Sequence, residues 1–154
     1  WGESAAQPLE RGHALAAIPP HQVVVKVPVT NSGAAVAQAL ITTGTAVTFT
    51  ACYEPAQVLI AAALGARYIA PYLGRISDLG RDGHAELLQM QRCLEGLGSS
   101  VRLLVASLRH SSDLTRLAAE GVSTFTISPA IAEALFASEA TTAAAAQFEQ
   151  DALA

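Results

Sequence analysis

The chain has 154 residues, of which 51% are apolar, and a formal net charge of −4, so it can bury a core and is not a disordered tail. Charged residues make up only 14% of the chain and no segment gathers basic ones, which excludes a nucleic-acid footprint and a membrane-surface patch. The longest apolar run, residues 58–66, is far shorter than the roughly 20 residues that span a bilayer, and no leader pattern opens the sequence, so we expect a cytoplasmic protein.

A repeated strand and helix unit runs along the chain. A helical pattern covers residues 2–17, and short β-branched segments follow it, each leading into an alanine- and leucine-rich helical pattern. The segments are residues 23–29, 45–50, 67–71, 101–106 and 123–127. They are nearly continuous apolar runs, as expected for strands covered on both faces, so the sequence predicts a parallel sheet under helices.

Helix boundary signals agree with these units. Thr30, Asn31 and Ser32 offer an N-cap after the first segment, and Gly33 permits close backbone approach. Ser128–Pro129 predicts an N-cap followed by proline at the first helical position. Likewise, Glu120–Gly121 predicts the end of the preceding helix.

Two further stretches depart from the regular repeat. The connection after residues 67–71 is long and contains Gly74, Gly80 and Gly83, which makes it a candidate site loop. The alanine-rich tail, residues 141–154, predicts a terminal helix with Phe148 as its one large anchor.

The repeated units, with a helix before the first strand, predict an α/β fold of the (β/α)₈ TIM-barrel type, in preference to a small complete doubly wound sheet. Only five units are present, whereas a closed barrel has eight and typically about 250 residues. We therefore expect residues 1–154 to form a single partial barrel domain that holds strands four to eight and a C-terminal helix. The chain opens at Trp1 instead of methionine, which fits the expectation of a fragment lacking about three units.

Lys26 is the only lysine of the chain, beside eight arginines. It lies among valines near the carboxyl end of the first predicted strand, where barrel enzymes place reactive groups. Burial there lowers the pKa of an amine and supplies the neutral form that attacks a carbonyl. The alternative is an edge-strand lysine whose ammonium group reaches water.

Three sequence motifs resemble the transaldolase and fructose-6-phosphate aldolase family. The run from Val24 to Thr30, which contains Lys26, looks like its Schiff-base strand. The run from Ala70 to Ile76 resembles its sixth-strand motif, and the run from Ala106 to Arg109 resembles its seventh-strand motif. Thr50 falls where the family places a threonine beside the catalytic water.

The resemblance implies a class I aldolase mechanism without cofactor or metal. Lys26 would form an imine with a ketose phosphate, the C3–C4 bond would break, and a dihydroxyacetone unit would be released or transferred. Thr50 and Tyr72 would orient the water or hydroxyl that moves protons. The implied phosphate-binding side chains are those of Arg75, Ser107 and Arg109.

The residues at the two implied phosphate motifs also have a structural interpretation. Taken singly, Arg75, Ser107 and Arg109 are ordinary surface residues, and Tyr72 is a half-buried aromatic with a wet hydroxyl. Tyr72 and Ala70 follow the fructose-6-phosphate aldolase pattern, because larger transaldolases usually carry phenylalanine and serine there. Cleavage is therefore favoured over group transfer.

Two other functional readings remain open. The family takes an aspartate, an asparagine and a glutamine or glutamate from its first three strands, which this chain does not contain. A catalytically incomplete partial barrel with a binding or structural role is therefore the alternative, and its exposed strand edges predict a homo-oligomer. A deoxyribose-phosphate type of aldolase fits less well, because it pairs two lysines.

The remaining polar residues suggest no further site. His13, His21 and His84 have no acidic or cysteine partner at ligand spacing, so they predict solvated histidines and no metal site. Residues 110–113 predict a cap and first helical turn instead of a triad. Asp78 and Asp82 could order the neighbouring loop but would repel a phosphate. Cys52 and Cys93 are expected to be reduced core residues.

Overall fold

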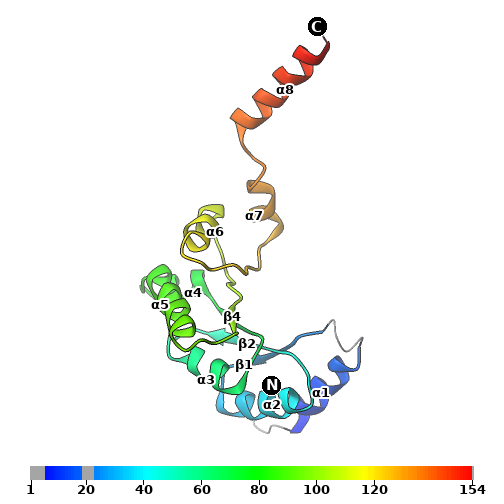
Figure 1. Cartoon of the computed structure of the whole chain (residues 1–154), viewed down its shortest axis with the longest axis vertical. Helices are drawn as coiled ribbons and strands as arrows, with labels where there is room; N and C mark the ends of the chain where they lie inside the picture. The colour runs from blue at the N-terminus through cyan, green and yellow to red at the C-terminus, as the bar shows by residue number, and fades with distance from the viewer. Residues whose placement is uncertain (1–5, 19–22, 154) are drawn as a thin grey trace.

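Strands and helices alternate along the computed structural model, which describes residues 6–18 and 23–153 (Figure 1). The elements in chain order are α1 (Ala6–Ala16), β1 (Val25–Pro28), α2 (Asn31–Thr42), β2 (Val47–Cys52), α3 (Gln57–Leu64), β3 (Tyr68–Pro71), α4 (Leu73–Asp78), α5 (Gly83–Gly96), β4 (Arg102–Leu103), α6 (Ser111–Ala118), α7 (Pro129–Ala134) and α8 (Glu139–Leu153). The predicted helix start at Gly2, His21 and the tail end at Ala154 lie outside the described residues.

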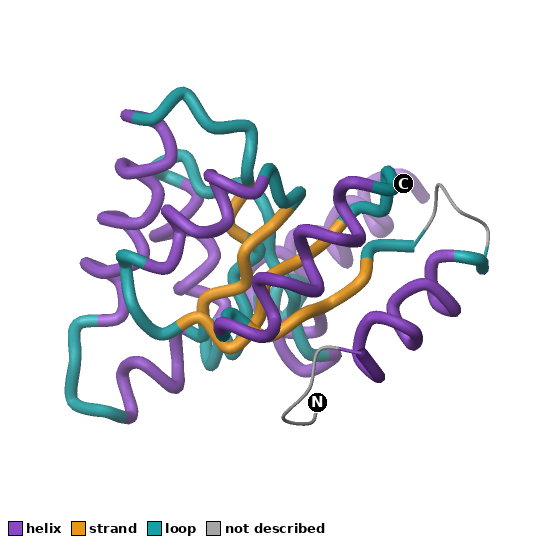
Figure 2. The backbone as a smooth tube through the Cα atoms, turned by 90° about the horizontal axis from the view of Figure 1, so that it is seen from below, coloured by secondary structure: helices purple, strands orange, loops and turns teal. Residues whose placement is uncertain are grey.

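The sheet is parallel, as the sequence predicted, and its strand order follows the chain, β1-β2-β3-β4. Figure 2 shows the strands (orange) lying among the helices (purple). The prediction of a fifth strand at residues 123–127 is wrong. This segment joins the sheet only through one bridge, between Val105 and Phe125. Val105 lies beyond the two-residue β4, where the chain already leaves regular pairing. The β-branched residues of 123–127 therefore have too little partner backbone to extend a ladder.

The core lies between the sheet and the helices that pack against it. Apolar side chains from all four strands share this face: Val25, Val27, Val47, Phe49, Ile69 and Leu103. Helices α2, α3 and α5 contribute Leu40, Val58, Leu87 and Met90, each of which is fully buried. The alternation within β1, where Val25 and Val27 are buried and Lys26 is exposed, shows that one face of that strand is covered.

The predicted boundary residues occupy their expected positions. Thr30 Oγ1 accepts a hydrogen bond from Gly33 N at 3.1 Å and caps α2. Ser128 caps α7 in the same way, ahead of Pro129. A Cβ on Gly33 would lie 2.0 Å from the carbonyl oxygen of Pro28, so only glycine fits where α2 leaves β1.

The long connection after β3 is helical and not the extended loop predicted from its glycines. Residues Leu73–Asp78 form α4, and Gly80, with φ of 77°, makes the turn into α5. Gly83 allows α5 to pack closely on α4, because a Cβ there would lie 2.9 Å from the carbonyl oxygen of Leu73. The glycines therefore serve turn geometry and helix contact.

The predicted terminal helix is present as α8, but Phe148 does not anchor it. Helix α8 has no buried residue and extends away from the sheet (red in Figure 1). Phe148 is 70% exposed, because α8 has no partner element in the described chain. No helix of the described residues is long and apolar enough to cross a membrane.

Candidate active site

The carboxyl ends of the parallel strands bring several predicted site residues to one edge of the sheet. Lys26 pairs in register with Thr48 of β2, and Thr50 pairs with Pro28. Tyr72 follows β3 directly and forms a bridge with Ala106, the residue before Ser107. Since parallel strands end at the same edge, these residues gather where α/β enzymes build their sites.

Lys26 is exposed, so the expectation that it is buried among valines is wrong. Val25 and Val27 on either side are 1% and 0% exposed and face the helices. Lys26 alternates to the other face, in the cross-strand row that continues through Thr48, Tyr68 and Arg102. The valines therefore do not shield its amine in this chain.

Thr50 and Tyr72 form a hydrogen bond, with 2.7 Å between Oγ1 and the phenolic oxygen. Both side chains are half-buried. The register of β2 against β3 shifts between Phe49 and Cys52, which inserts one extra residue into β2. Ala51 has φ of 55° inside this bulge, a conformation that costs a non-glycine residue energy. The bulge thus lies beside Thr50 and sets how the end of β2 is presented to Tyr72.

Tyr53 belongs to this cluster, although the sequence did not single it out. Its ring meets the Tyr72 ring edge-on, with centroids 5.6 Å apart and an interplanar angle of 77°. Arg75 lies over the Tyr72 ring, with Cζ 4.7 Å from the centroid, and its Nη1 donates to the Tyr53 hydroxyl at 3.5 Å. That hydrogen bond raises the pKa of Arg75 above its ordinary value, so the guanidinium stays charged.

Polar contacts fix the turn that carries Tyr53. Gln57 Oε1 accepts hydrogen bonds from the backbone N–H groups of Tyr53 and Glu54, at 2.9 and 3.1 Å. Arg81 donates to Glu54 at 2.6 Å and also pairs with Glu86 of α5. These two carboxylates raise the pKa of Arg81. The turn after β2 is therefore tied to α3 and α5, which holds Tyr53 against Tyr72.

Ser107 and Arg109 meet the start of α4, which carries Arg75. The backbone N–H of Gly74 donates to the Ser107 carbonyl at 2.9 Å. A Cβ on Gly74 would lie 2.4 Å from that oxygen and 2.6 Å from Arg109 Nε, so glycine permits the approach. Ser107 itself has φ of 59°. The two motifs that sequence placed on separate strands are thus in contact.

Arg75 and Arg109 differ in their charged partners. Arg109 pairs with Asp78 at 2.5 Å, and the two side chains are 54% and 59% exposed. Such an exposed pair contributes little energy, so an anion can displace it. Arg75 has no carboxylate within ion-pair distance among the described residues. Of these two, Arg75 is therefore the guanidinium more available to a ligand, because Asp78 already pairs with Arg109.

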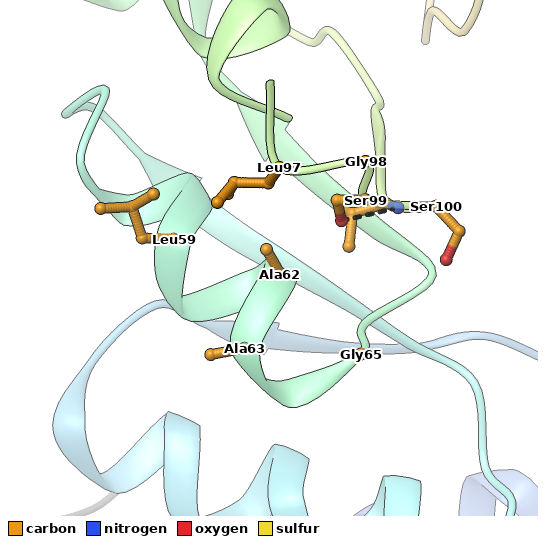
Figure 3. Close-up of a pocket in the computed structure, with 9 residues that line it drawn as sticks. Leu59, Ala62, Ala63, Gly65, Leu97, Gly98, Ser99 and Ser100 are labelled. Carbon is orange, nitrogen blue, oxygen red and sulfur yellow. Dashed lines mark hydrogen bonds between the residues drawn. The ribbon is translucent and has the colours of Figure 1, made fainter. Parts of the chain in front are cut away.

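One surface groove adjoins these residues, and another lies at the opposite end of the sheet. A groove of about 490 Å³ runs beside Arg109 between residues 108–112 and α7. A second groove, of about 530 Å³, lies between α3 and the turn before β4, where Leu97 points toward α3 (Figure 3). Its lining includes Gly65 and Val101, which precede strands, so it lies at the amino ends, opposite the candidate site.

Within residues 6–18 and 23–153, no cluster of His, Cys, Asp and Glu could hold a metal ion. The side chain of Lys26 makes no hydrogen bond or ion pair to any residue of this described part. The connected residues are therefore Thr50, Tyr53, Tyr72 and Arg75 on one side, and Gly74, Ser107 and Arg109 on the other. Backbone contacts between α4 and residues 106–107 join the two groups.

Comparison with known proteins identifies relatives of this chain. The family model described as Transaldolase/Fructose-6-phosphate aldolase matches residues 2–154. A "Probable transaldolase" of Anaeromyxobacter sp. (strain K) is 38% identical over 114 residues, which cover 74% of this chain and 52% of that protein. Proteins with the same description from Caulobacter sp. (strain K31) and Maridesulfovibrio salexigens are 35% and 31% identical, and the matches cover 64% and 70% of their lengths. The match to the Anaeromyxobacter relative thus spans about half of that protein.

Proposed function

This chain belongs to the transaldolase/fructose-6-phosphate aldolase family, and we propose that it cleaves or transfers a dihydroxyacetone unit of a ketose phosphate through an imine on Lys26. The observation that carries this proposal is the 2.7 Å hydrogen bond between Thr50 and Tyr72 at the sheet edge reached by the Lys26 strand. Two coupled hydroxyls can hold a water molecule and pass a proton through it.

The proposed reaction begins at the amine of Lys26. Its lone pair adds to the ketone carbon of the ketose phosphate, and loss of water gives an iminium ion. A base removes the proton of the C4 hydroxyl, the C3–C4 bond breaks, and its electron pair moves into the iminium to give an enamine. The aldehyde phosphate leaves. The enamine is then protonated and hydrolysed to dihydroxyacetone, or it attacks an acceptor aldehyde.

In this proposal Thr50 and Tyr72 position the water or hydroxyl that moves these protons. Arg75, Ser107 and Arg109 bind the phosphate of the substrate, because guanidinium groups match phosphate oxygens and serine adds a neutral donor. The contact of Gly74 with Ser107 and Arg109 supports this assignment, since it places both phosphate motifs together. No metal or organic cofactor takes part in the proposed chemistry.

We infer that the sheet is part of a (β/α)₈ barrel, with β1 to β4 as strands four to seven and residues 123–127 in the place of the eighth. The uninterrupted strand order supports this, because a doubly wound sheet reverses its order at a switch point. Residues 1–154 then form one partial barrel domain. Exposed apolar side chains on the C-terminal segment, such as Phe136 at 85% and Leu153 at 89%, support a homo-oligomer.

Borohydride trapping tests the proposed function. The chain is incubated with dihydroxyacetone or fructose 6-phosphate, reduced, digested and analysed by mass spectrometry. We expect an adduct on the peptide that contains Lys26 and none in Lys26→Arg, whose exposed side chain can be replaced without disturbing the core. A label confined to the N-terminal amine would contradict the proposal.

A second measurement separates an enzyme from an incomplete barrel. Release of an aldehyde phosphate from fructose 6-phosphate is followed with a coupled dehydrogenase. Turnover together with the Lys26 adduct supports the enzyme. An adduct without turnover supports the alternative, a partial barrel that binds the sugar but lacks the acid and base groups needed to cleave it.

A further inference from the structure

The segment 106–110, which carries Ser107 and Arg109, is held at both ends. At its beginning, the backbone N–H groups of Leu73 and Gly74 donate to the carbonyl oxygens of Ala106 and Ser107, at 3.0 and 2.9 Å. At its end, the backbone N–H groups of Arg109 and His110 donate to the carboxylate of Asp113. Ser107, at the first anchor, has φ of 59°, a conformation that costs a non-glycine residue energy and that the surrounding contacts must hold.

The second anchor is the carboxylate of Asp113, on the first turn of α6. Its Oδ2 accepts hydrogen bonds from Arg109 N at 3.2 Å and from His110 N at 3.0 Å. The side chain is only 12% exposed. A carboxylate that accepts two backbone hydrogen bonds fixes that backbone more strongly than a neutral acceptor does. Asp113 therefore fixes the position from which the Arg109 side chain extends.

His84 of α5 faces the other oxygen of this carboxylate. Its Nε2 lies 3.3 Å from Asp113 Oδ1, within ion-pair distance but outside hydrogen-bond geometry, and the side chain is 16% exposed. Nε2 is buried and has no hydrogen-bond partner within the described parts of the chain. A buried ring nitrogen without a partner is costly, so the carboxylate is the group that His84 faces. The sequence expectation of a solvated His84 is therefore wrong.

We propose that His84 and Asp113 are positioning residues for phosphate binding, acting through the segment 106–110. This inference rests on the proposed function, because it assigns a role to residues behind the proposed phosphate group. Asp113 holds the backbone of Arg109, and His84 holds Asp113 to α5, which packs on α4 and thus on the element that carries Arg75. The pair aligns Arg109 with Arg75 before an anion arrives, which reduces the ordering cost of binding.

A matched pair of variants separates this role from simple helix capping. Asp82 also caps a helix, because its carboxylate accepts a hydrogen bond from Ala85 N at 3.0 Å at the start of α5. Asp82→Ala and Asp113→Ala each remove one such capping carboxylate, yet only Asp113 holds the segment 106–110. Asp113→Asn keeps an oxygen that can accept the two backbone hydrogen bonds and serves as the conservative variant.

The experiment uses inorganic phosphate, titrated into the isotope-labelled full chain and followed through backbone amide signals in NMR spectra. We expect Asp113→Ala to weaken phosphate binding by about fivefold or more, as loss of hydrogen bonds to a charged acceptor implies, and Asp82→Ala to leave it unchanged. Asp113→Asn restores most of the affinity. His84→Leu weakens it by about twofold to threefold, because the carboxylate keeps its backbone bonds.

Failure of this inference can be distinguished from failure of the proposed function. Equal phosphate affinity in Asp113→Ala and the unaltered chain overturns the inference, and so does equal weakening by Asp82→Ala and Asp113→Ala. The same holds if the unaltered chain binds no phosphate, since there is then nothing to position. Trapping with dihydroxyacetone, which has no phosphate, is run on the same samples and reports on Lys26 alone.

Discussion

The Tyr72 hydroxyl lies 2.7 Å from Thr50 Oγ1, so a residue just beyond β3 is bonded to the end of β2. The bulge in β2 at Thr50 and Ala51 makes this approach part of the fold, because it sets the direction in which that strand end leaves the sheet. A hydrogen bond between two half-buried hydroxyls, one on β2 and one directly after β3, is a suitable place to hold a reactive water molecule.

Removing one hydroxyl of this pair should lower the rate of cleavage without preventing imine formation. We expect Tyr72→Phe to reduce kcat by about 100-fold, at the low end of what a positioned acid or base contributes. Thr50→Val, which keeps the side-chain shape, should act in the same direction. Both variants should still be trapped at Lys26 by borohydride. Loss of trapping together with turnover would show that the hydroxyls serve imine formation or folding instead.

Arg75 should determine the preference for phosphorylated substrates. Arg75→Ala is expected to raise KM for fructose 6-phosphate by about tenfold, the value of one hydrogen bond between charged groups, while trapping by dihydroxyacetone is retained. Arg92→Ala is the matched control. Arg92 is an exposed arginine of α5 whose Nε donates to Leu88 O within its own helix. Equal effects of the two variants would indicate a general loss of positive charge.

The strands and the caps could be predicted because they depend on local patterns. The valine-rich run around Lys26, the hydroxyl of Thr30 and the proline after Ser128 each act within a few residues of themselves. The family motifs added the order of the site residues along the strands. Gly33 was predicted to permit close backbone approach, and the Pro28 carbonyl fills that space.

The rest of the site depends on contacts between distant segments. Tyr53 joins Tyr72 and Arg75 just after the β2 bulge, which a two-residue periodicity does not encode. His84 and Asp113 are 29 positions apart in the chain, yet their side chains approach to 3.3 Å. Exposure of Lys26 follows from what covers its face of the sheet, which the sequence around Lys26 does not specify.

Gly33 should be a strong determinant of stability. Gly33→Ala places a Cβ 2.0 Å from the Pro28 carbonyl, and forcing atoms into a packed region costs about 1–3 kcal/mol or more. Gly96→Ala is the control, because a Cβ there meets nothing within 4 Å and alanine favours the end of α5 by about 0.5–1 kcal/mol. Urea unfolding followed by circular dichroism measures both changes. Similar midpoints for the two variants would contradict the close packing of α2 on β1.

The two cysteines should differ sharply in reactivity. Cys52 is 0% exposed, and burial raises the pKa of its thiol to about 12. At pH 8 only about one Cys52 in ten thousand is then the thiolate that alkylating reagents attack, and that thiolate is inaccessible as well. Cys93 is partly exposed on α5, so native iodoacetamide treatment should label Cys93 alone, whereas treatment in urea should label both. Raising the pH from 7 to 9 should leave Cys52 protected until the chain unfolds, because burial keeps its thiol protonated in this range. Peptide mass spectra measure both labelling rates. Rapid native labelling of Cys52 would show that β2 opens locally. It would also weaken the assignment of Thr50 to the site.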